Sequence, residues 1–127
     1  MSQSAVAGCV SARFSQCAYA RFVDVVEFLS LRIAEDEAAA RKLLNDRSVS
    51  ESGRWYERRL LLECEAKKRL IGIVESARQA ALAALVSNSD GDADWIPEAI
   101  EWTTLSLNAL ALPYFDHPDF EQHWLKL

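Results

Sequence analysis

The chain has 127 residues, of which 50% are hydrophobic and 26% are charged. This size and balance indicate one folded domain with one hydrophobic core, and they exclude a disordered chain. The net charge of −5 argues against general binding to nucleic-acid phosphates, which normally requires a basic face.

The sequence predicts a cytoplasmic protein without a membrane partner. Its longest apolar run, Ala80 to Val86, is far shorter than the roughly 20 residues that cross a bilayer. Residues 1–20 lack the basic start and sustained apolar stretch of a signal peptide. We interpret them as an extension before a single helical domain at 21–127. The three cysteines show no paired spacing, which indicates reduced thiols.

The first predicted helix spans residues 22–46. Asp36 and Glu37 interrupt its apolar stripe where another apolar residue is expected. We expect a carboxylate there to be buried against Lys68 or Arg69 of the next helix, or to lie at an interface. Buried ion pairs often fix the choice of partner, so this position favours a role in pairing. The stripe recurs at steps of three and four, as in an amphipathic helix, and contains Phe22, Val26, Leu29, Ile33, Ala40 and Leu44.

The second predicted helix spans residues 51–86, after a polar loop at 45–50 and a capping box formed by Ser48 and Glu51. It would be about 50 Å long, whereas a compact domain of this size is about 36 Å across. The helix must therefore protrude, kink or pack against a second chain, and Gly72 is the expected place of a kink or close crossing. Its apolar stripe contains Trp55, Leu62, Ala66, Leu70, Ile73, Ala77, Ala81 and Ala84.

Two more helices are predicted after a second loop at 87–92. The third, at 97–112, is apolar nearly all round, which predicts a place in the core or in an interface. A short fourth helix at 117–125 is expected to pack back on the core. The predicted fold is therefore all-α, with two long antiparallel amphipathic helices, a buried third helix and a short C-terminal helix.

The segment Asp-His-Pro-Asp at 116–119 is the most distinctive polar string, because such groups bind metals or transfer protons. A structural interpretation is favoured, in which Asp116 caps the last helix and Phe115 packs on Phe120 as a hydrophobic staple. The residues of this cap and staple are Phe115, Asp116, Pro118, Asp119, Phe120 and Trp124.

No motif in the sequence identifies a reaction. The Glu-x-x-His pattern of helical dimetal sites, glycine-rich phosphate loops and nucleophile motifs do not occur in it. We therefore assign no catalytic, cofactor-binding or metal residue, expect no cofactor and do not favour an enzyme. The candidate interaction or polar site consists of Asp36, Glu37, Glu65, Arg69, Asp116 and His117.

Three parts of the sequence are similar to a known family. They are EFL with RIAEDEAAAR in 27–41, LECEAKKR at 62–69, and LALPY with DHPD and Trp124 in 110–124. Together they resemble domain of unknown function 6221, small proteins of actinobacteria and their phages. The resemblance implies no activity, but it suggests a phage or prophage origin and an accessory or host-interaction role. Many relatives carry a longer insertion where this chain has only Asn45 to Arg54.

The favoured hypothesis is an interaction protein that self-associates as a homodimer or binds a host protein. One alternative is a metal-binding protein or enzyme that uses His117 with helix carboxylates. Another is a regulator that binds nucleic acid, although nucleic acid is not the expected partner. Its basic stripe on the second helix would contain Arg54, Arg58, Arg59, Lys67, Lys68 and Arg69.

Overall fold

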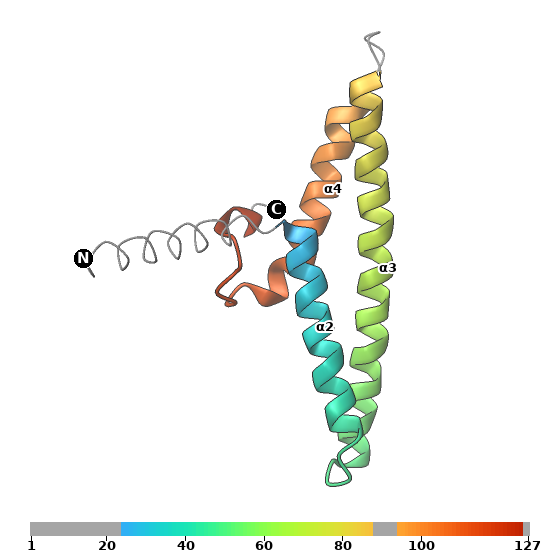
Figure 1. Ribbon diagram of the computed structural model, residues 1–127, viewed down its shortest axis with the longest axis vertical. Helices are drawn as coiled ribbons and strands as arrows, with labels where there is room; N and C mark the ends of the chain where they lie inside the picture. Colours follow the sequence, from blue (N-terminus) through green and yellow to red (C-terminus); the bar gives the residue numbers. More distant parts are fainter. Residues whose placement is uncertain (1–23, 88–93, 126–127) are drawn as a thin grey trace, which may run out of the picture.

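The computed structural model describes residues 24–87 and 94–125, which form an all-α fold, as predicted (Figure 1). Within these residues there are three α-helices, two short 3-10 helices and no strand. The predicted extension at 1–20 and most of the predicted loop at 87–92 lie outside the described residues. The elements are α2 Val25–Leu44, α3 Glu51–Ser87, α4 Trp95–Ala111, η2 Leu112–Tyr114 and η3 Gln122–Leu125.

The helix α3 forms the long axis of the molecule, and α2 and α4 lie end to end along one side of it (Figure 1). α2 precedes α3 in the sequence and α4 follows it. Both run antiparallel to α3 (Figure 1). α3 has 37 residues, while α2 has 20 and α4 has 17, so the two shorter helices together match its length. The predicted antiparallel pair is therefore confirmed, and α4 covers the part of α3 that α2 does not reach.

The start of α3 is close to the predicted one, but its cap is Ser50 rather than Ser48. Ser50 Oγ accepts a hydrogen bond from the Gly53 N–H at 3.1 Å, as an N-cap side chain does. Ser48 instead donates its N–H and its hydroxyl to Asp46 Oδ1, at 2.9 and 2.7 Å. These two bonds hold the pKa of Asp46 below its usual value. The predicted capping box is therefore wrong, because the Asp46 turn engages Ser48.

The central glycine of α3, Gly72, makes no close helix crossing. A Cβ atom built at this position meets no atom within 4 Å. α3 is also one unbroken helix from Glu51 to Ser87, without a sharp bend in Figure 1. The expected kink or close crossing at Gly72 is therefore wrong. Because α2 and α4 together lie along the length of α3, the straight helix finds packing partners without bending.

The core lies where α2, α3, α4 and the C-terminal segment meet. At its centre the ring of Phe28 lies 6.1 Å from that of Phe120 and 5.0 Å from that of Trp124. Such aromatic pairs stabilise a core beyond the area that they bury. The C-terminal segment therefore folds back on α2, as predicted for these two aromatic residues. The other buried members are Val25, Leu29, Ile33, Cys64, Ile71, Leu107 and Ala111.

Two predictions for the C-terminal third are wrong. α4 buries Leu107 and Ala111 but exposes Trp95 and Trp102, so it is not buried all round. The predicted helix at 117–125 is replaced by turns and by the short η3.

The reason for the missing helix is the local backbone. The N–H groups of Phe115, His117 and Phe120 bond to carbonyl groups three residues earlier. Pro118 has no N–H, so it cannot continue a ladder of helical hydrogen bonds. The chain therefore turns repeatedly instead of forming an α-helix.

Candidate functional site

The predicted polar residues do not converge on one cleft. Asp36 ties α2 to the C-terminal segment, because the Tyr114 hydroxyl donates to its Oδ2 at 2.7 Å. Burial first, and then this bond, raise the pKa of Tyr114 well above its ordinary value of about 10. The phenol therefore stays protonated and acts as a donor.

A second tie between the same segments involves Arg32 and His117. Arg32 is only 7% exposed, and its guanidinium contacts His117 Nε2, donates to Glu35 Oε1 at 3.0 Å and lies over the Phe28 ring. His117 Nδ1 accepts a hydrogen bond from the Asp119 N–H at 3.0 Å. His117 Nδ1 is therefore occupied by the Asp119 N–H and Nε2 lies against the Arg32 guanidinium, so neither nitrogen is open to a metal ion.

A chain of charges ties α2 to α3. Lys68 Nζ lies 2.6 Å from Glu37 Oε1 and 3.3 Å from Glu65 Oε2, and Glu65 accepts from Arg69 at 3.0 Å. The Glu37 side chain is 13% exposed, so the expected burial of a carboxylate against Lys68 is confirmed. Hydrogen bonds to Glu37 and Glu65 raise the pKa of Lys68, and those from Arg69 and Lys68 lower the pKa of Glu65.

The predicted cap and staple do not form. Asp116 is exposed and lies in a turn at which no helix begins. Phe115 is 61% exposed, whereas Phe120 and Trp124 are buried in the core. A staple requires a helix start between its two apolar residues, and the turns at 115–119 remove that start. Of the predicted set, only Phe120 and Trp124 close the core.

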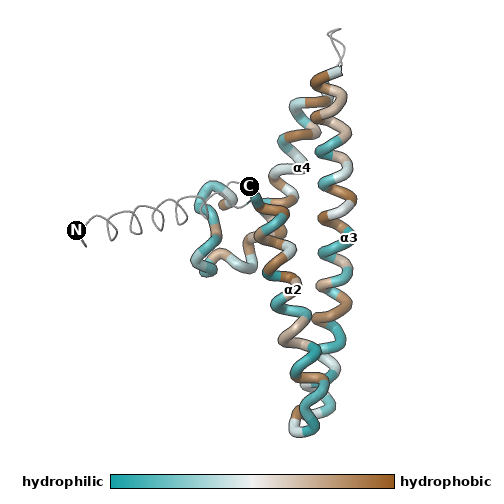
Figure 2. The backbone as a smooth tube through the Cα atoms, in the orientation of Figure 1, coloured by the Kyte–Doolittle hydropathy of each residue, from teal (hydrophilic) through white to brown (hydrophobic). Residues whose placement is uncertain are grey.

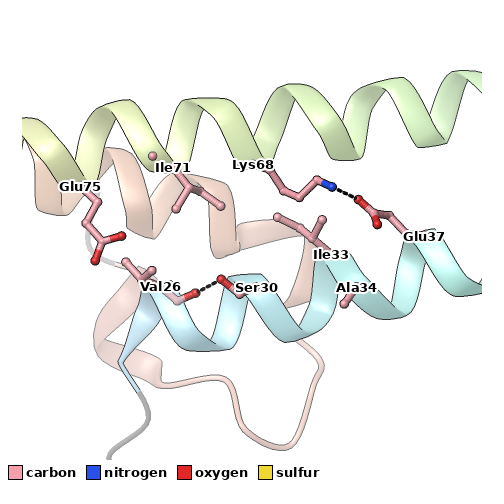
Figure 3. A pocket seen from close by; sticks show the side chains of 9 residues that line it. Val26, Ser30, Ile33, Ala34, Glu37, Lys68, Ile71 and Glu75 are labelled. Atoms are coloured by element: carbon pink, nitrogen blue, oxygen red, sulfur yellow. Dashed lines mark hydrogen bonds and ion pairs between the residues drawn. The ribbon is translucent and has the colours of Figure 1, made fainter.

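A groove of about 320 Å³ lies between α2 and α3 (Figure 3). The Lys68–Glu37 pair spans one end and Glu75 lies at the other. Its volume is at the low end for a small-molecule site, and its Ser30 hydroxyl already donates to the Val26 carbonyl at 2.8 Å. The groove is lined by Val26, Ser30, Ile33, Ala34, Glu37, Lys68, Ile71, Gly72 and Glu75.

The part of the chain that the structure describes contains no group of three His, Cys, Asp or Glu residues placed to hold a metal ion. Cys64 is fully buried, and burial raises the pKa of its thiol. A buried, protonated thiol is a poor nucleophile. The geometry of the described residues therefore gives no support to the metal or enzyme alternative.

The basic side chains of α3 are largely held by protein acceptors. Arg54 donates to the carbonyl oxygens of Leu44 and Asp46, both at 3.0 Å. Arg59 pairs with Glu63 at 3.0 Å, in the same way that Arg69 pairs with Glu65. A stripe neutralised in this way is a weak site for phosphates.

The most distinctive surface is the side of α3 that faces away from α2 and α4, which we call the outer face. α3 packs on these helices through other residues, chiefly Cys64, Ile71 and Ala81. The predicted apolar stripe of this helix therefore points mainly to solvent rather than to the core. Of the outer face, Ala84 is half-buried and the rest is exposed. The outer face consists of Trp55, Leu62, Ala66, Ile73, Ala77, Ala80 and Ala84.

Figure 2 shows that the first turns of α3 are hydrophilic and that hydrophobic residues alternate with hydrophilic ones along the rest of the helix. By length and composition alone α3 could cross a membrane, with a mean hydropathy of 1.4 over 18 residues, of which 11% are buried. A single such helix is weak evidence, because core helices of soluble proteins pass the same test. The result agrees with an uncovered apolar surface on this helix.

The comparison with known proteins found one family. The family model described as a family of unknown function (DUF6221) matches residues 22–126. No curated protein and no solved structure matches the chain. The match gives a lineage and no activity, so the function must be argued from the surface of the molecule.

Proposed function

Since this chain belongs to DUF6221, a family of unknown function, we propose its role from its surface: it is a protein-interaction module that self-associates through the outer face of α3. The observation that carries this proposal is the exposure of Trp55, Leu62 and Ile73, at 51%, 72% and 67%. Single exposed apolar residues are ordinary, whereas a row that follows one helix face for about eight turns is typical of an interaction site.

Two further features of the proposal, the origin and the location of the protein, rest on its sequence. The three similar sequence segments support a small accessory protein of phage or prophage origin, for which the bound protein would be a host protein or a second copy. The odd number of cysteines without paired spacing supports a cytoplasmic location. The sequences of the neighbouring genes would test the phage or prophage origin.

Sedimentation equilibrium of the full chain tests the proposal. We expect the wild-type protein to have twice its monomer mass of 14.3 kDa at high micromolar concentration. The double variant Leu62→Glu with Ile73→Glu should sediment as a monomer, because two carboxylates would be desolvated in the interface. Leu31→Glu is the matched control, since Leu31 is exposed on α2, and it should leave the dimer intact.

Two results would contradict the proposal. One is a wild-type protein that remains monomeric at every concentration. The other is co-sedimentation of that monomer with anionic or neutral lipid vesicles, lost in the double variant, because the outer face would then bind a membrane rather than a protein.

A further inference from the structure

We propose that the occupant of the outer face is the same face of a second copy, with the two α3 helices antiparallel about a two-fold axis between Arg69 and Leu70. This inference rests on the proposed function and adds the partner, the orientation and the register. A two-fold interface requires a surface that complements itself, and the outer face has this property only in the antiparallel sense.

The sizes of the side chains complement one another in this register. Trp55 lies opposite Ala84 of the second copy, Leu62 lies opposite its Ala77, and Ile73 lies opposite its Ala66. Each large side chain thus faces a methyl group, and the two-fold axis repeats every pair on the other side. Layers of constant volume allow two helices to approach evenly along their whole length, as close packing requires.

A parallel pair in register lacks this complementarity. It would place Trp55 on Trp55 and Leu62 on Leu62, which forces the helices apart in those layers. It would also place Ala77, Ala80 and Ala84 on their own copies, where the same separation leaves voids. Voids and overpacked layers each cost stability, so the parallel arrangement is disfavoured.

The distribution of charge favours the same orientation. Charged residues are frequent in the first half of α3, whereas its second half, from Leu70 to Ser87, contains only Glu75 and Arg78. Antiparallel pairing brings Arg59 against Ala80 of the second copy and leaves only Arg69 near its own copy. Parallel pairing in register would bring both Arg59 and Arg69 against their own copies. Like charges that face each other across an interface are unfavourable.

The two Arg69 residues lie close to the proposed axis. Each is paired with Glu65 of its own helix at 3.0 Å, which offsets their repulsion.

The area of the outer face is that of a weak dimer. The outer face runs from residue 55 to residue 84, about 44 Å at 1.5 Å per residue, and a helix is about 10 Å wide. The two copies together would cover roughly 900 Å² in projection, which is just below the lower limit of roughly 1,000 Å² for a stable specific interface and within the range of weak, transient ones. A second copy can therefore occupy this face along its full length.

Disulfide cross-linking of full-length variants that each carry one introduced cysteine tests the register. Cys9 and Cys17 are replaced by serine, while the fully buried Cys64 is kept. In the proposed dimer the Cα atoms of the two Arg69 residues are roughly 6 Å apart, within the range of a disulfide. Arg69→Cys should therefore give a covalent dimer under mild oxidation. Its reversal by reductant on a denaturing gel is the readout.

Two controls distinguish orientation from mere proximity. Leu62→Cys alone should give no covalent dimer, because its two copies would be about 22 Å apart along the helix. A mixture of Leu62→Cys with Ala77→Cys should give a mixed covalent dimer. Cross-linking of Leu62→Cys with itself would overturn the antiparallel register while leaving the proposed self-association intact. A wild-type protein that sediments as a monomer would overturn both.

Discussion

Individual side chains hold the C-terminal segment on α2, and Tyr114 provides the clearest test. Replacing it with phenylalanine removes the hydrogen bond to Asp36 and should lower the free energy of unfolding by about 1–2 kcal/mol. The pKa of Tyr114 is raised in the folded state, so the phenol ionises first in the unfolded chain. The stabilising effect is therefore complete below pH about 10 and decreases as the pH rises above it.

Denaturant unfolding of the wild type and of Tyr114→Phe at several pH values measures this effect. The difference between the two should shrink at alkaline pH. Tyr56→Phe is the matched control, because Tyr56 is exposed and should show no difference at any pH. A wild-type advantage that persists or grows above pH 10 would argue against this role of Tyr114.

The two glycines of α3 should respond in opposite ways to alanine. Gly72→Ala should stabilise the protein by about 0.5–1 kcal/mol, because alanine is the better helix former and its Cβ has free space. Gly53→Ala should gain less or destabilise, because its Cβ would lie 2.8 Å from Val49 Cγ1. Thermal unfolding followed by circular dichroism compares them. Equal shifts of both midpoints would show that the space around these residues does not matter.

Part of the polar arrangement could be predicted from the sequence. Glu37 interrupts an apolar stripe, so its burial against Lys68 followed from periodicity. The contacts of Asp36 with Tyr114 and of Arg32 with His117 join residues 78 and 85 positions apart, and no local pattern indicates them.

At the scale of whole elements, the bounds of α2, α3 and α4 were predicted to within a few residues, because polar loops separate strongly periodic segments, whereas the predicted helix at 117–125 does not form. The side of α3 that packs on the core was not predicted correctly. This helix is apolar on two opposite sides, one through Leu60, Cys64 and Ile71 and the other through the outer face. Periodicity alone cannot tell which side meets the core, since that depends on where α2 and α4 lie.

The C-terminal segment gives a test at the same scale. Trp124→Ala should cost about 3–5 kcal/mol, because it leaves a cavity beside Phe28. Phe115→Ala should stay within about 0.5 kcal/mol, because its side chain is exposed. Chemical denaturation gives both values. A large loss of unfolding free energy in Phe115→Ala would contradict this account and would support the hydrophobic staple between Phe115 and Phe120.

At the scale of the molecule, two short helices lie along one side of a long one, and their lengths add to that of α3 (Figure 1). Such a layer covers only one side of α3. The long helix therefore neither protrudes nor kinks, but it keeps an apolar outer face for which the described residues provide no cover. Pairing of two copies would place this helix at the centre of a larger bundle, which is how the fold leads to the proposed function.

The most direct test of this account is the mass of the wild-type protein in solution. Sedimentation equilibrium over a range of concentrations should show an approach to twice 14.3 kDa as the concentration rises. A mass of 14.3 kDa at every concentration would contradict self-association through α3.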